Sequence, residues 1–109
     1  MESLGLVEKF IIGYIQHENF GRIYIMTSTG ESPEKTVAKL IADEIAADDK
    51  VKIKITPKIE AALKKLQEYW MIQVSGYEVK FTSYGQQVAK ELDKQTYLKI
   101  KQQVSQGKL

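Results

Sequence analysis

The stretch "WMIQVSGYEVKFTSYG", Trp70 to Gly85, decides the fold of this 109-residue chain. Apolar and polar residues alternate on both sides of Ser75-Gly76, as in a β-hairpin with a two-residue turn. The cross-strand pairs that follow are Val74 with Tyr77, Ile72 with Val79, and Trp70 with Phe81. All six apolar side chains would then lie on one buried face, and Trp70 is expected in the core beside Tyr14 and Phe81.

The residues before the hairpin predict a helix, a strand and a second helix. The first helix, from about Leu4 to Glu18, is indicated by apolar residues at helical spacing: Val7, Phe10, Ile11, Tyr14 and Ile15. Alternation predicts a strand from Arg22 to Ser28. Ser32 is a helix cap and Pro33 a first helical residue, and the second helix is expected to bury Val37, Leu40, Ile41 and Ile45.

Lysines alternate with apolar residues from Lys50 to Ile55, which predicts an extended segment. A third helix would begin at Thr56 and Pro57 and bury Ile59, Leu63, Leu66 and Trp70. Thr82 would cap one last helix, from about Ser83 to Gln106, that ends at Gly107. A helix of that length reaches about 36 Å, more than a small domain needs, so residues 93–107 are expected to form a C-terminal extension for dimerisation.

Composition and charge narrow the class of protein. With 43% hydrophobic and 28% charged residues, the chain is expected to form a single domain over residues 1–109, without a membrane span or secretory signal, in the cytoplasm. The absence of cysteine and the single histidine exclude disulfides and thiolate or multi-histidine metal sites, and no cofactor is expected. The net charge of +2 is too small to indicate nucleic-acid binding by itself. Evidence for such binding therefore has to come from where the charged residues lie along the chain.

The predicted order of helix, strand, helix, helix, hairpin and helix is that of a winged helix-turn-helix domain, mainly α with a small antiparallel β-sheet (α+β). The segment from Ile55 to Leu92 resembles winged-helix transcription regulators of the MarR and PadR type. The resemblance lies in the Leu-x-x-Leu of Leu63 and Leu66, the hairpin, and the Thr-x-x-Gly of Thr82 and Gly85. It implies a DNA-binding homodimer that regulates transcription.

The third helix is where such a protein contacts double-stranded DNA. Its outward face is predicted to carry Lys58, Ala61, Lys64, Lys65 and Glu68, so the lysines can reach phosphates while the small Ala61 lets the helix approach a groove. The expected DNA-binding residues are Lys54, Thr56, Lys58, Ala61, Lys64, Lys65, Gln67 and Lys80, with Thr56 and Gln67 near bases. Because the face lacks arginine and asparagine, strong base specificity is not expected.

The sequence leaves one alternative function open and argues against an enzyme. A winged helix can also serve as a protein-protein interaction module in a larger assembly, which the modest net charge and the acidic Glu60 and Glu68 favour. An enzyme is not expected, because the carboxylates Asp43, Glu44, Asp48 and Asp49 fit an exposed acidic loop and His17 has no partner at a catalytic spacing. No motif in these residues indicates a particular DNA target or a small-molecule effector.

Overall fold

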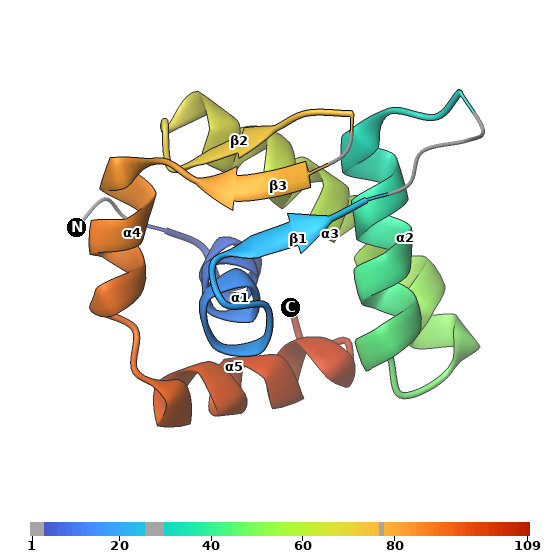
Figure 1. Cartoon of the computed structure of the whole chain (residues 1–109). Helices are drawn as coiled ribbons and strands as arrows, with labels where there is room; N and C mark the ends of the chain where they lie inside the picture. The colour runs from blue at the N-terminus through green and yellow to red at the C-terminus, as the bar shows by residue number, and fades with distance from the viewer. Residues whose placement is uncertain (1–3, 26–29, 77) are drawn as a thin grey trace.

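A computed structural model of the chain, which describes residues 4–25, 30–76 and 78–109, places helices around one side of a small antiparallel sheet (Figure 1). The elements are α1 (Leu6–Gly13), the π-helix η1 (Tyr14–Glu18), β1 (Arg22–Tyr24), α2 (Pro33–Ile45), α3 (Asp49–Glu68), β2 (Ile72–Val74), β3 (Glu78–Phe81), α4 (Ser83–Lys90) and α5 (Lys94–Ser105). The prediction of a mainly α fold with a small antiparallel sheet is confirmed. None of the described helices could cross a membrane.

The sheet has the strand order β1-β3-β2, so β3 pairs with both neighbours. Arg22 pairs with Lys80, and Ile72 pairs with Phe81. The predicted register was therefore wrong by two residues, because Ile72 was expected opposite Val79. A two-residue error keeps each side chain on its expected face, since the strand period is two, and Ile72, Val79 and Phe81 are buried as predicted. Two predicted parts, Met26 to Ser28 of the first strand and Tyr77 of the hairpin, lie outside the described residues.

The segment from Lys50 to Ile55 is helical, so the prediction of an extended stretch, and of a third helix that begins at Thr56, was wrong. Asp48 caps α3, and its side chain accepts a hydrogen bond from the Val51 N–H at 2.8 Å. Pro57 lies inside the helix instead of at its start. Burial explains the continuity, because Ile55 and Ile59, on either side of the proline, are both 0% exposed.

Trp70 was expected in the core and is instead 76% exposed, because α3 ends before it. Its φ of 60° is left-handed, and the N–H groups of Trp70 and Met71 donate to the carbonyls of Gln67 and Leu66, both at 3.0 Å. These bonds make a Schellman ending in which glycine usually holds the left-handed position. Met71 takes the core place expected of the tryptophan. Leu40 was also wrongly expected to be buried, and is 52% exposed.

Thr82 and Gly85 have the local roles that their spacing suggests. The Thr82 hydroxyl caps α4 by accepting a hydrogen bond from the Gly85 N–H at 3.0 Å. A Cβ on Gly85 would lie 1.8 Å from the carbonyl oxygen of Met71, so only glycine lets α4 start this close to the chain entering β2.

The predicted last helix, from Ser83 to Gln106, is two helices, so that prediction was wrong. Asp93 caps α5, accepting a hydrogen bond from the Thr96 N–H at 2.7 Å, and the chain turns sharply between α4 and α5 (Figure 1). A straight helix of about 36 Å would have exceeded the longest Cα extent of the domain, 33 Å. Instead, α5 packs along α1 and buries Tyr97, Ile100 and Val104. The length of a single last helix, which was the reason to expect a dimerisation extension, therefore no longer applies.

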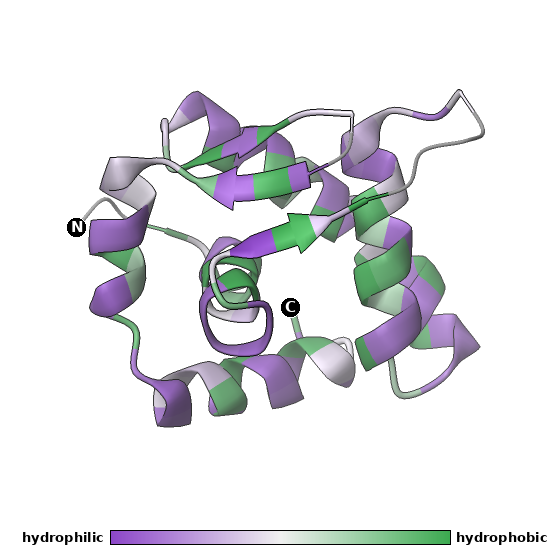
Figure 2. Ribbon diagram, viewed as in Figure 1, coloured by the Kyte–Doolittle hydropathy of each residue, from purple (hydrophilic) through white to green (hydrophobic). Residues whose placement is uncertain are grey.

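Hydrophilic and hydrophobic segments alternate along the helices and strands (Figure 2), as expected of elements that each bury one side. Polar contacts join η1 to its neighbours at the edge of the core. The Tyr14 hydroxyl donates to Glu44 at 2.8 Å, and Glu18 accepts from Tyr97 and pairs with Lys101. Burial and the carboxylate partners raise the pKa of both tyrosines, so their hydroxyls stay protonated donors at neutral pH. Burial opposes ionisation of Glu18, but the bonds from Tyr97 and Lys101 outweigh it and lower the pKa of this carboxyl.

Replacing Trp70 by glycine should raise the free energy of unfolding by about 0.5–1 kcal/mol. The expected relief of left-handed strain, about 1–2 kcal/mol, exceeds the extra chain entropy of glycine, about 0.5–1 kcal/mol. Trp70→Ala keeps the Cβ and should bring no gain. Urea titrations followed by far-UV circular dichroism measure both variants. A glycine variant less stable than wild type would contradict the assigned strain.

Candidate nucleic-acid interface

The outward face of α3 brings together five of the eight expected DNA-binding residues. Ile55, Ile59, Ala62, Leu63 and Leu66 are buried along the helix, and the opposite side is exposed. That exposed side carries Lys54, Lys58, Ala61, Lys64 and Lys65. The small Ala61 therefore lies among lysines, with the exposed Glu68 two turns later on the same side of the helix.

Correcting the start of α3 adds a lysine that the expected set of DNA-binding residues left out. In a helix, Lys50 falls four residues before Lys54 and eight before Lys58, so the three share one exposed side, whereas an extended chain would have grouped Lys50 with Lys52. Lys52 turns toward α2 and pairs with Asp43. We call Lys50, Lys54, Lys58, Ala61, Lys64 and Lys65 the α3 lysine face. The signal for Lys50 was the four-residue spacing of the lysines.

Three expected residues do not lie on the α3 lysine face. Thr56 is half-buried and its hydroxyl donates to the Lys52 carbonyl at 2.6 Å. Gln67 is half-buried and its amide donates to Glu34 at 3.0 Å. Lys80 lies on β3, opposite Arg22, and pairs with Glu78 at 3.7 Å. Contact of these three with DNA stays a prediction, and the two residues expected near bases already have partners within the chain.

The lysines of the face differ in how far their charges are engaged. The Lys54 ammonium donates to the carbonyl of Gly107 at 2.7 Å, and so ties α3 to the C-terminal turn. Lys64 pairs with Glu60 at 3.3 Å one turn earlier on the helix. The ammonium groups of Lys50, Lys58 and Lys65 have neither a hydrogen bond nor an ion pair among the described residues. These three ammonium groups are available to a ligand without breaking a contact of the fold.

Lys58 and Lys65 also line one hollow on this side of the molecule. Its other lining residues come from α1, α3 and the C-terminus: Leu6, Val7, Glu8, Ala61, Ala62 and Leu109. Two ammonium groups at a mostly apolar depression suit a ligand in which an anionic group adjoins a less polar one. The phosphate and sugar of a nucleic-acid backbone are such a pair. Glu8 contributes an opposing charge to the lining, and it accepts a hydrogen bond from the Gly5 N–H at 3.0 Å.

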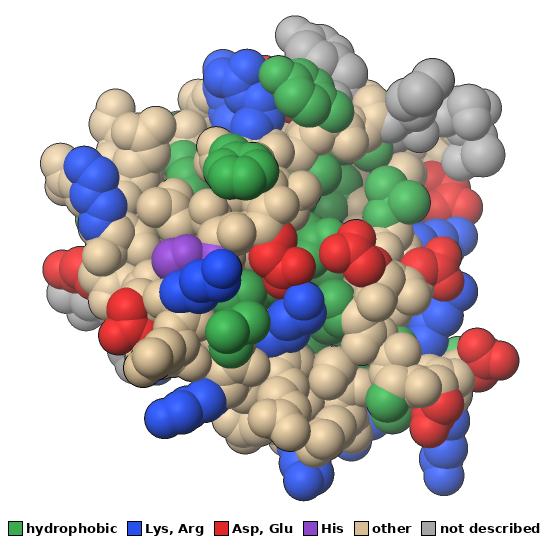
Figure 3. Space-filling view, turned by 60° about the horizontal axis from the view of Figure 1, so that its bottom comes forward, with side chains coloured by type: hydrophobic (Ala, Val, Ile, Leu, Met, Phe, Trp, Pro, Cys, Tyr) green, Lys and Arg blue, Asp and Glu red, His purple; other side chains and the backbone are tan. Residues whose placement is uncertain are grey.

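Other surfaces show a different distribution of charge. On the side seen in Figure 3, acidic and basic side chains are interspersed. Such a surface has little net field. Within the part of the chain that the structure describes, no cluster of three or more potential metal ligands occurs.

The two kinds of lysine should respond differently to neutral replacement. Lys54→Met is expected to lower the free energy of unfolding by about 1 kcal/mol, because it removes a charged hydrogen bond to Gly107. Lys58→Met and Lys65→Met, which break no contact, should change it by less than about 0.5 kcal/mol. Urea denaturation of the three variants tests this. Equal losses in all three would mean that Lys58 and Lys65 are also structural.

Protein-family models, curated protein sequences and solved structures were compared with this chain, and none of the three gave a match. The geometry and charge of the α3 lysine face are therefore the grounds for a function.

Proposed function

We propose that this protein is a winged helix-turn-helix protein that binds double-stranded DNA through α3 and regulates transcription or associates with DNA less specifically. The order of α1, β1, α2, α3 and the β2–β3 hairpin supports the fold assignment. Fold alone does not imply function, so the proposal depends on the site. The observation that carries it is the α3 lysine face: five exposed lysines around the small Ala61 on one 20-residue helix.

The side chains favour contact with the phosphate backbone over base reading. Lysine ammonium groups neutralise phosphates, which supplies affinity but no sequence information. The face has neither arginine for guanine nor asparagine for adenine, and the amide of Gln67 is bonded to Glu34. Lys58 and Lys65 are seven residues apart, about 10 Å along the helix axis, so they can reach different phosphates. We therefore expect weak dependence on sequence and strong dependence on salt.

We also propose a homodimer, which would present two α3 helices to successive major grooves about 34 Å apart. The predicted contact was the C-terminal helix. Because α5 buries Tyr97, Ile100 and Val104 against its own chain, only its outer side, with Leu98 at 47% exposure, is left to face a second copy. A dimer contact through α5 would thus have less exposed apolar surface to bury than a free helical extension would have had.

A protein-protein interaction module is the second candidate. Glu60 and Glu68 lie on or beside the α3 lysine face, and Glu60 pairs with Lys64, which reduces the positive field that a duplex would meet. This function predicts no salt-dependent affinity for DNA.

Salt dependence distinguishes the two candidates. Binding to a labelled duplex of about 20 base pairs, measured by anisotropy from about 50 to 200 mM salt, should weaken steeply if phosphates are contacted. The double variant Lys58→Gln, Lys65→Gln should bind more weakly, and its slope of log affinity against log salt should be shallower by about 2, since each lost phosphate contact removes about 0.9.

The matched control is Lys90→Gln, Lys99→Gln, which removes the same charge from exposed positions of α4 and α5. Of these two helices, α5 packs chiefly against α1, and α4 packs against α1 and β3. The control should keep the wild-type slope. An equal loss in both double variants would indicate a response to net charge alone, and a flat salt response of the wild type would refute DNA binding through α3.

A further inference from the structure

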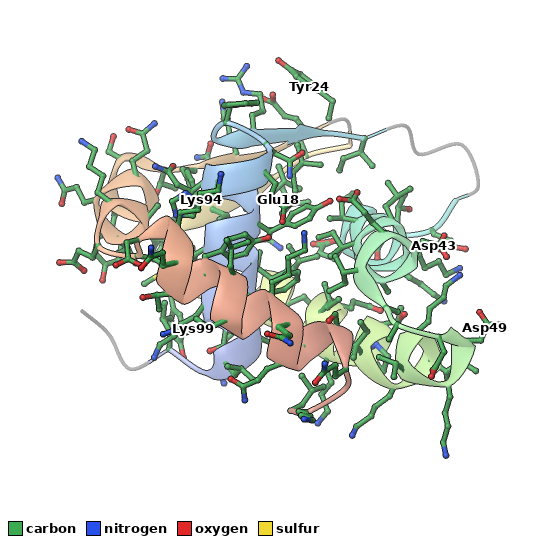
Figure 4. All side chains as sticks on the ribbon, turned by 90° about the horizontal axis from the view of Figure 1, so that it is seen from below. Glu18, Tyr24, Asp43, Asp49, Lys94 and Lys99 are labelled. Carbon is green, nitrogen blue, oxygen red and sulfur yellow. The ribbon has the colours of Figure 1, made fainter. Side chains whose placement is uncertain are left out.

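The outer face of the sheet presents an aromatic and basic strip on β1 and β3. Ile23 points toward the core side with its partner Val79, so Arg22 and Tyr24 point outward, opposite Lys80 and Glu78. Tyr24 is 71% exposed, and Figure 4 shows it at the edge of the molecule, directed away from the helices. Figure 3 shows hydrophobic and basic side chains next to one another at this end. We call Phe20, Arg22, Tyr24 and Lys80 the β1 strip.

Phe20, two residues before Arg22, is costly to the fold in two ways. Its φ of 55° is left-handed, a conformation that disfavours a bulky residue by about 1–2 kcal/mol. Its side chain is 95% exposed, so burial of the ring contributes almost nothing to the stability of the fold. A glycine or asparagine would serve the chain better at this turn. A strained and exposed aromatic residue is a reason to look for a contact outside the chain.

The Arg22 cation lies beside the Tyr24 ring. The Arg22 guanidinium lies 5.9 Å from the centre of the Tyr24 ring and donates to its hydroxyl at 3.3 Å. Glu78 pairs with Arg22 at 3.5 Å and with Lys80 at 3.7 Å, but its side chain is only 14% exposed, against 49% and 42% for the two cations. Of the charges that a ligand meets on this face, the basic groups are therefore the more accessible.

The size and chemistry of the strip favour nucleobases over a protein partner. Two aromatic side chains offer on the order of 300–500 Å², whereas a stable protein interface buries about 800 Å² on each partner. Phe20 lies in the left-handed turn just before β1, and Arg22 and Tyr24 lie on the strand itself. Stacking needs bases whose faces are free, and in a duplex these faces are already covered by neighbouring base pairs.

We propose that the β1 strip binds single-stranded nucleic acid, with bases stacked on Phe20 and Tyr24 and the backbone phosphates beside Arg22 and Lys80. This activity goes beyond the duplex binding proposed for α3 and uses a different surface. Exposed aromatic rings with cations near them supply affinity for any sequence, because every base has a π-face and every nucleotide a phosphate.

The test is anisotropy of a labelled oligothymidylate of about ten nucleotides, with the full chain in excess. Wild type should bind it. Phe20→Gly and Tyr24→Ala should each weaken binding about tenfold or more, because each removes one stacking platform. Phe20→Gly relieves strain, so its loss of affinity should come with unchanged or higher thermal stability, which excludes unfolding as the cause.

Two controls separate stacking on the β1 strip from a general loss of aromatic surface or of positive charge. Trp70→Gly also removes an exposed aromatic residue from a left-handed position, but at the opposite edge of the sheet, and should keep the affinity for the single strand. Lys58→Gln, Lys65→Gln should keep it within about twofold while its duplex binding falls. No binding by wild type, unchanged binding by both strip variants, or an equal loss in Trp70→Gly would overturn the assignment, and none of these results bears on duplex binding by α3.

Discussion

The passage of α3 through Pro57 is the constraint on which the rest of the structure depends. A proline inside a helix costs about 3 kcal/mol, because the carbonyl four residues earlier loses its partner and is crowded by the ring. Keeping the helix continuous buries Ile55, which contributes about 1.5–3 kcal/mol, and retains the Asp48 cap, which contributes about 1 kcal/mol. These terms are large enough to offset the proline. A break at Thr56 would have removed Ile55 from the core and Lys50 from the side that carries Lys58.

Local signals in the sequence predicted the elements whose ends are set locally. Ser32 with Pro33, Thr82 with Gly85, and Gly107 each end or begin a helix as expected, because a cap or a left-handed residue acts within one turn. The errors arose where two rules competed. Pro57 has the chemistry of a helix start, yet core packing continues the helix through it. The Asp93 cap breaks the last helix without any glycine or proline, and the hairpin register could slip by two residues without changing which side chains are buried.

The residues of the candidate interface could be predicted from the sequence where the bounds of its helix were predicted correctly. Lys58, Ala61, Lys64 and Lys65 follow the Ile59, Leu63 and Leu66 stripe by helical geometry, so their exposure could be read from spacing. Lys50 could not be placed until the helix start was known. The partners of Lys54 and Gln67, which are Gly107 and Glu34, are 53 and 33 residues away in sequence, and no local pattern reports such contacts. Sequence therefore predicts which lysines are outside, and the structure separates those that hold the fold from those that are free.

The two proposed surfaces face away from the core in different directions. In Figure 1, the sheet that contains β1 lies in front of α3, and core residues fill the space between them. A duplex on the α3 lysine face and a single strand on the β1 strip would consequently not compete for one site, and would be separated by the thickness of the domain. The smallest Cα extent of the domain is 22 Å, close to the diameter of a duplex. If both surfaces bind, the nucleic acid that satisfies them together is one in which a duplex passes into a single strand, because neither form alone offers both a paired backbone and open base faces.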